Sequence, residues 1–141
     1  MKVLLLPALV MLVGLATMVR AEPVVVVNAA SSIQHLSQDE VINIFLGRYR
    51  RLPNGEAAIP IDQPDSGILR AEFYRKLVNK GLNEVNAYWA RLIFSGRTSP
   101  PLQATEPAEV IGLLMANPGG VTYVDRSQVD KRLRIVLEFP K

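Results

Sequence analysis

Few side chains in this sequence are of the kinds that perform catalysis or hold a metal ion. The chain contains no cysteine and a single histidine, His35, which together exclude thiol chemistry and a conventional zinc site. No serine or threonine is paired with a base in a recognisable nucleophile motif. We therefore expect a binding protein rather than an enzyme, without a metal ion or a cofactor.

The densest charge lies in the segment 48–55, a basic loop that closes on turn residues. Its charged side chains, which flank Tyr49, are Arg48, Arg50 and Arg51. Two interpretations remain open for this segment: a solvated loop, or a docking surface for an acidic partner.

The chain is close to neutral once its first residues are set aside. Lys2 and Arg20 are the only charged residues before Glu22, so 14 of the 16 basic residues and all 13 acidic residues follow. This near-balance gives no reason to expect nucleic acid or an anionic membrane as the partner.

The first 21 residues have the pattern of an export signal. Lys2 precedes an almost uninterrupted apolar run over residues 3–19, and the triplet 19–21 suits cleavage before Glu22. The run is short for a membrane-spanning helix, which needs roughly 20 residues, and a retained anchor is the alternative. We therefore expect a signal peptide at 1–21 and a single domain at 22–141, located in the periplasm.

Strands and helices alternate through the remainder of the chain. The β-branched run 23–28 is typical of a strand buried on both faces, and Ser37 with Glu40 forms the capping box of a helix that stops at Gly47. This alternation indicates an α/β domain with a mostly parallel sheet flanked by helices. Strands are expected at 23–28, 57–61, 121–124 and 133–139, and helices at 37–46, after Gly67, after Asn83 and at 107–117.

The helix after Asn83 carries the only tryptophan of the chain. Trp89 shares one stripe with Val85, Leu92 and Ile93, which is the ordinary pattern of a helix packed on a sheet. We therefore expect these four side chains in the core rather than around a cofactor.

The order of these signals resembles the second lobe of phosphate-transporter periplasmic substrate-binding proteins. The resemblance spans residues 24–138 and rests on four short segments, which are 36–40 (LSQDE), 44–47 (IFLG), 65–67 (DSG) and 117–124 (NPGGVTYV). The sequence is most similar to the small, single-lobe members of that group. The resemblance implies a single lobe of the type II periplasmic-binding-protein-like fold and a link to an ABC-type phosphate transport system.

Two-lobed members of this family bind an oxyanion at a helix start in the cleft between their lobes, where N–H groups and a partial positive charge receive it. In this chain, the helix at Ser37 carries Asp39 and Glu40 in its first turn, which repel an anion. The helix after Ser66 has no acid there, so it is the better anion site.

The ligand-binding residues expected from this comparison are Ser66, Gly67, Arg70, Gln63, Ser31 and Ser32. Ser31 and Ser32 follow the first strand and would line the same edge of the sheet as Ser66. The plainer interpretations stay open: Ser66 as only an N-cap, and the two other serines as turn residues.

The chain also departs from the family pattern. Asp62 stands where the larger proteins have arginine, Ile68 stands where they have threonine, and Asp65 adds a charge beside the site. A single lobe moreover presents an open surface, whereas ligand pockets bury most of a small ligand. We therefore expect weak binding of inorganic phosphate or a similar oxyanion.

Tighter binding would need a second wall, supplied by a second copy of the chain in a homodimer or by a membrane permease or sensor. The alternative function is a periplasmic sensory or regulatory module that contacts a protein and has lost ligand binding.

Overall fold

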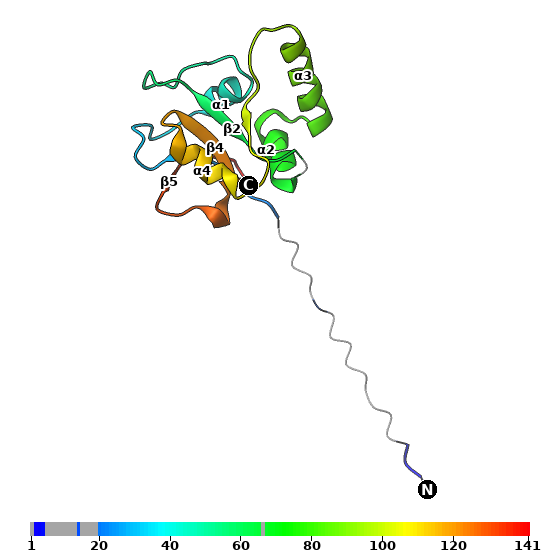
Figure 1. Cartoon of the computed structure of the whole chain (residues 1–141). Coiled ribbons are helices and arrows are strands. Elements are labelled where there is room, and N and C mark those ends of the chain that lie inside the picture. Colours follow the sequence, from blue (N-terminus) through cyan, green and yellow to red (C-terminus); the bar gives the residue numbers. More distant parts are fainter. Residues whose placement is uncertain (1, 5–13, 15–19, 66) are drawn as a thin grey trace.

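The structure is a computed structural model of the 141-residue chain, and it describes residues 2–4, 14, 20–65 and 67–141 (Figure 1). The expected signal peptide lies mostly outside the described residues. No helix among the described residues is both long and apolar enough to span a membrane.

Five strands form one sheet in the order β3-β2-β4-β1-β5. Their bounds are β1 Pro23–Asn28, β2 Ile59–Asp62, β3 Leu102–Gln103, β4 Gly120–Asp125 and β5 Leu133–Glu138. β2 runs parallel to β3 and to β4, whereas β1 runs antiparallel to both β4 and β5. Four strands therefore point one way and β1 alone is reversed, so two of the four pairings are parallel and the two that involve β1 are antiparallel. The expected α/β domain is confirmed, with a mixed sheet.

β1 is buried on both faces, as its unbroken apolar sequence indicates. Val25 and Val27 point into one cluster of buried apolar residues, and Val24 and Val26 point into a second cluster on the other face, because successive strand residues alternate between faces. The continuous valine run thus signals two covered faces, and it carries no information about strand direction.

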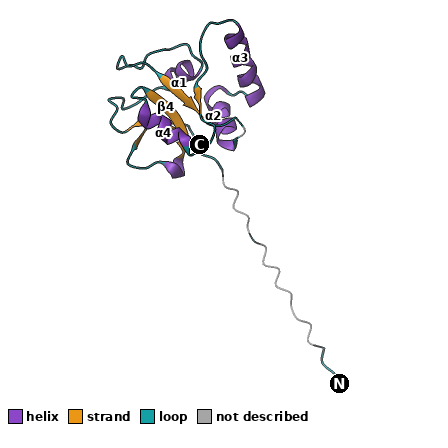
Figure 2. Ribbon diagram, viewed as in Figure 1, coloured by secondary structure: helices purple, strands orange, loops and turns teal. Residues whose placement is uncertain are grey.

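Helices cover both faces of the sheet (Figure 2). The bounds are α1 Gln38–Phe45, α2 Ile68–Val78, α3 Leu82–Phe94 and α4 Glu109–Ala116, with a 3-10 turn at Arg126–Gln128. Buried residues of α1, α2 and α3 belong to the first cluster, and those of α4 to the second. The capping box of α1 is confirmed: Glu40 N–H donates to Ser37 Oγ at 3.1 Å, and Ser37 N–H donates to the Glu40 carboxylate at 3.0 Å.

Two details of the sheet differ from expectation. β2 begins at Ile59 instead of Ala57, and β3 lies in a segment expected to be only a loop, since a two-residue strand leaves no periodic signal. The backbone segments that precede β2 and β4 lie unusually close to each other: a Cβ on Gly119 would lie 1.7 Å from the carbonyl oxygen of Ala57. Glycine is therefore required where β2 and β4 first meet.

The stripe on α3 is confirmed only in part. Val85 and Trp89 are buried, and Leu92 is half-buried, but Ile93 is 54% exposed. The reason is that α3 packs against α2, away from the sheet, as Figure 1 shows. A helix on the outside of the layer buries a narrower stripe than a helix packed directly on a sheet.

Candidate functional site

The end of β2 and the start of α2 enclose a buried polar cluster, which we call the Asp62 cluster: Asp62, Arg70, Tyr74 and Tyr123. The carboxylate of Asp62 accepts hydrogen bonds from Arg70 Nε at 3.2 Å, from the Tyr74 hydroxyl at 2.8 Å, and from the Tyr123 hydroxyl. The N–H of Gln63 also donates to it, at 2.9 Å. Each oxygen of the carboxylate thus accepts two hydrogen bonds from other groups of the protein.

The chain positions this cluster through simple local geometry. Asp62 is the last residue of β2, and Arg70 and Tyr74 stand four residues apart on α2, a spacing that puts two side chains on the same helix face. Tyr123 comes from β4, and its ring stacks on Phe73 with centroids 3.7 Å apart. Three elements therefore converge on a single carboxylate.

Arg70 is buried and almost fully engaged. Its side chain is 4% exposed, Nη2 donates to Asn86 Oδ1 at 3.2 Å, and the guanidinium lies 5.2 Å from the Tyr74 ring centroid. Nη1 is buried and has no hydrogen-bond partner among the described residues. The carboxylate of Asp65, which is 74% exposed, lies 3.7 Å from Nη1.

The surroundings fix the protonation of the cluster. Burial, and then the charge of Asp62, raise the pKa of Tyr74 and of Tyr123 well above the ordinary value. For Arg70, burial is the largest single effect and lowers the pKa, but the charge and hydrogen bond of Asp62 together with the two tyrosines outweigh it, so the pKa is raised overall. The cluster therefore holds one guanidinium and two neutral phenols around Asp62.

This arrangement predicts how the protein responds to alkali. Because the phenol pKa values are raised in the folded state, folded protein retains protons that the unfolded chain releases above about pH 10. The stability from these phenols is complete below that pH and is lost as the pH rises further. We expect Tyr74 and Tyr123 to ionise only as the protein unfolds, so their part of the phenolate absorbance should rise together with the loss of circular dichroism. The Tyr74→Phe/Tyr123→Phe variant should lack that part, and a rise well before unfolding would contradict the assignment.

The structure brings some of the expected ligand residues together. Gln63, Gly67 and Arg70 lie at the end of β2 and the start of α2, and Ser66 lies outside the described residues. Gly67 is the N-cap of α2, so the cap position falls one residue after Ser66. Gln63 is buried, and its amide donates to the carbonyl of Tyr123 at 2.8 Å, so this donor is already used inside the protein.

Ser31 and Ser32 lie elsewhere, and the prediction that they share an edge with the α2 start is wrong. They follow β1, which runs opposite to β2, so they lie at the edge where β2 begins rather than where it ends. There Ser32 Oγ accepts a hydrogen bond from Asn54 at 2.9 Å, and Ser31 Oγ accepts one from the N–H of Ile33 at 3.1 Å. Both serines act in turns.

No family model matches the sequence, and no curated protein matches it either. Solved structures do match over 82% of this chain. One, assigned as a phosphate ABC transporter substrate-binding protein with bound phosphate, from Clostridium perfringens, has a TM-score of 0.64 and 13% identity. An ABC-type phosphate transport receptor from Vibrio cholerae has a TM-score of 0.63 and 14% identity. A possible phosphate-binding protein from Planctomyces limnophilus has a TM-score of 0.58 and 11% identity.

At such identities the likeness shows the fold. The chain is built like one lobe of a periplasmic binding protein, and it spans less than half of those three proteins, with 44%, 45% and 40% of their lengths covered. The matched structures are phosphate-binding or phosphate-transport proteins by their descriptions.

Proposed function

We propose that this protein is a periplasmic solute-binding-protein-like module of the phosphate type, linked to ABC-type transport, which works as a single lobe and binds an oxyanion weakly. Its role is binding rather than catalysis. The fold shared with phosphate-binding proteins supports the class. The observation that carries the site is Arg70 Nη1, a buried guanidinium nitrogen without a hydrogen-bond partner among the described residues, beside the start of α2.

The start of α2 suits an anion in two respects. Its N-cap, Gly67, has no side chain to occupy the first N–H groups, and the first turn contains no acid, so the positive end of the helix dipole is uncompensated by its own residues. An oxyanion that displaced the exposed carboxylate of Asp65 would meet these N–H groups and Arg70 Nη1 together.

Two features keep the affinity low. Asp62 already neutralises Arg70, and Asp65 places a second carboxylate beside it. A helix terminus contributes typically 0.3–1 kcal/mol to a charge, far below the roughly 8 kcal/mol of micromolar binding. In the cell the missing wall would come from a permease, a sensor or a second copy of the chain.

Removing the exposed carboxylate provides the test. Asp65→Asn deletes a negative charge near Arg70 Nη1 but keeps an oxygen that can accept the hydrogen bond of Gln103. We expect phosphate to bind this variant about threefold to tenfold more tightly than the wild type, tenfold being 1.4 kcal/mol. Calorimetric titration with phosphate and sulfate measures this.

The matched control is Asp39→Asn, which removes the same charge from the first turn of α1, at the far end of α2 from the site. It should leave phosphate affinity unchanged. Equal tightening in both variants would mean a general charge effect, and absence of binding by folded wild type and Asp65→Asn at millimolar phosphate would overturn the oxyanion proposal.

A specific observation favours a second candidate, a sensory or regulatory module that contacts a protein and binds no ligand. The Asp62 carboxylate occupies Arg70 Nε at 3.2 Å, where an anion would otherwise be received. The titration separates the two candidates, because only the first predicts any response to Asp65→Asn.

A further inference from the structure

Five exposed arginines gather on two segments that lie far apart in the sequence, and we call them the arginine surface: Arg48, Arg50, Arg51, Arg91 and Arg97. The first three belong to the loop between α1 and β2, and the other two to the end of α3 and the turn after it. None of the five forms an ion pair with a described residue. The exposed cations Arg75, Lys80, Arg126 and Arg132 each do.

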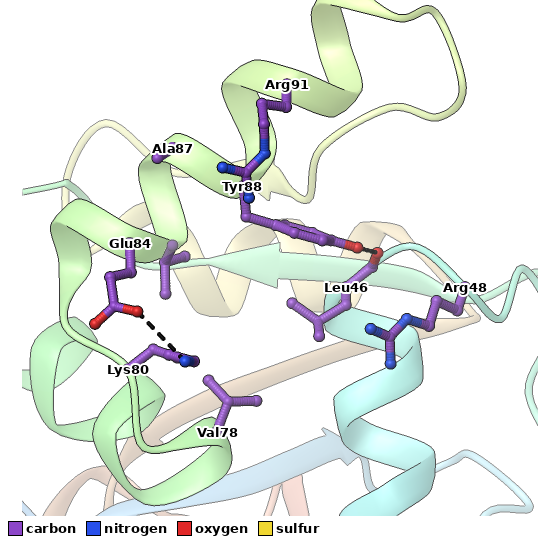
Figure 3. A pocket seen from close by; sticks show the side chains of 9 residues that line it. Leu46, Arg48, Val78, Lys80, Glu84, Ala87, Tyr88 and Arg91 are labelled. Atoms are coloured by element: carbon purple, nitrogen blue, oxygen red, sulfur yellow. Dashed lines mark hydrogen bonds and ion pairs between the residues drawn. The ribbon is translucent and has the colours of Figure 1, made fainter.

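Four of the five side chains line three hollows that share lining residues, and Arg51 lines a further hollow with Tyr49. Arg48 and Arg91 line a pocket of about 360 Å³, with the ring of Tyr88 between them in Figure 3. Arg50 and Arg97 line a groove of about 740 Å³, where Arg50 Nη2 donates to the carbonyl of Arg97 at 3.4 Å. Arg91 and Arg97 line a third hollow, which joins the two.

Two carboxylates lie at these hollows, and neither forms an ion pair with an arginine of this surface. Glu40 lines the hollow of Arg51, and its carboxylate accepts the hydrogen bond of the Ser37 N–H. Glu84 lines the same pocket as Arg48 and Arg91, but it is bound to Lys80, with 3.4 Å between Nζ and Oε2 (Figure 3). The hydrogen bonds that the loop arginines make go to uncharged oxygens, at Asn43, Arg97 and Gly55. Their positive charges therefore remain uncompensated within the described protein.

The charge is also unevenly divided. Of the 14 basic residues from position 22 onward, five are on this surface, whereas only two of the 13 acidic residues, Glu40 and Glu84, line its hollows. A near-neutral chain thus presents one strongly positive face. Such a face repels itself in the free protein, and its field attracts and orients an acidic partner.

Apolar side chains accompany the charge. Leu102 is 44% exposed and lines the groove with Tyr49, which is 50% exposed. Phe94 is 97% exposed, and it stands three residues after Arg91 on α3, a spacing that makes the two neighbours. Arginine beside aromatic side chains is the composition that protein interfaces favour.

We propose that the arginine surface docks an acidic segment of a partner protein, with carboxylates on the arginines and an apolar side chain in the groove beside Leu102. A protein segment fits better than a membrane, because the arginines line concave hollows. Each guanidinium can also donate two parallel hydrogen bonds to one carboxylate. This proposal goes beyond oxyanion binding and does not depend on it: Arg50 precedes β2, bonded to the N–H of Ala58, whereas Asp62 ends β2.

The test uses the full chain and a short fluorescent peptide of glutamate interspersed with leucine, followed by fluorescence anisotropy. We expect saturable binding that weakens with added salt, and no binding of the same peptide with glutamine for every glutamate. Arg91→Glu/Arg97→Glu should weaken binding at least about tenfold, or 1.4 kcal/mol. The matched control, Lys131→Glu/Lys141→Glu, makes the same charge change near β5, at the far edge of the sheet, and should weaken binding by no more than about twofold.

Equal weakening in the control variant, or no binding of the acidic peptide by the wild type, would overturn the proposal. A third arm uses phosphatidylglycerol vesicles: binding to them in preference to the peptide would assign the surface to a membrane instead. Thermal unfolding by circular dichroism checks that each variant is folded. Phosphate titration of Arg91→Glu/Arg97→Glu should match the wild type, so failure of the docking proposal is distinguishable from failure of the oxyanion site.

Discussion

Asp62→Ala is expected to lower the free energy of unfolding by about 3–5 kcal/mol, measured by urea denaturation. The substitution leaves the guanidinium of Arg70 buried without its carboxylate, and it removes the acceptor of the Tyr74 and Tyr123 hydroxyls. Breaking one side of a buried ion pair costs more than deleting both, because the remaining charge is uncompensated.

Two further variants test that reason. Asp62→Leu/Arg70→Met removes both charges and should recover much of the loss, although two hydroxyls stay without their acceptor. Asp65→Asn, a carboxylate on the same arginine but 74% exposed, should cost no more than about 1 kcal/mol. An Asp62→Ala loss no larger than that of Asp65→Asn would mean that the Asp62 cluster does not stabilise the fold.

The cluster also predicts that arginine is not tolerated in place of Asp62. Asp62→Arg would place a second guanidinium against the buried Arg70 and remove its counter-charge. Asp62 is therefore the counter-charge of a buried arginine, and it cannot be exchanged for a basic residue without breaking that pair.

Trp89→Ala is the second variant with a large expected effect, a loss of about 3–5 kcal/mol in the free energy of unfolding. Trp89 is 6% exposed and joins α3 to the cluster of buried apolar residues on that side of the sheet. Its ring lies against Gly47, where a Cβ would come within 3.0 Å of Trp89 Cη2. Removing the ring leaves a cavity between α1 and α3 that the backbone cannot close without moving the helix.

Phe94 on the same helix is the matched control, because it is an aromatic residue that is 97% exposed. Phe94→Ala should change the free energy of unfolding by less than about 0.5 kcal/mol. Urea denaturation of both variants makes the comparison. Similar losses at the two positions would contradict the packing of α3 described here.

Local signals in the sequence predict most of the elements. The valine run and the capping box give β1 and the start of α1 at their observed places, because both depend on neighbouring residues only. The direction of β1 is not local. It depends on pairing with β4 and β5, about a hundred residues later in the chain, and for this reason local signals place Ser31 and Ser32 at the wrong edge.

The candidate site likewise combines features that local sequence predicts with contacts that depend on the fold. An acid-free helix start next to Gln63 is visible in the sequence, and the structure places Gln63, Gly67 and Arg70 together. The contact of Asp62 with Arg70 does not follow from the helix start alone, although the sequence carries a signal for it: an acid ends a strand, and arginine and tyrosine stand four residues apart on the helix that follows. This spacing allows both side chains to reach the carboxylate, but it does not by itself show that they are buried with it.

The reversal of β1 has a consequence for how the chain is made. β1 lies inside the sheet between β4 and β5, and both of its partners come from positions 120–138, about a hundred residues later in the chain. Contacts of such long sequence separation slow folding, because a large loop must close before they form. The four valines of β1 therefore cannot be buried in the sheet until β4 and β5 have left the ribosome.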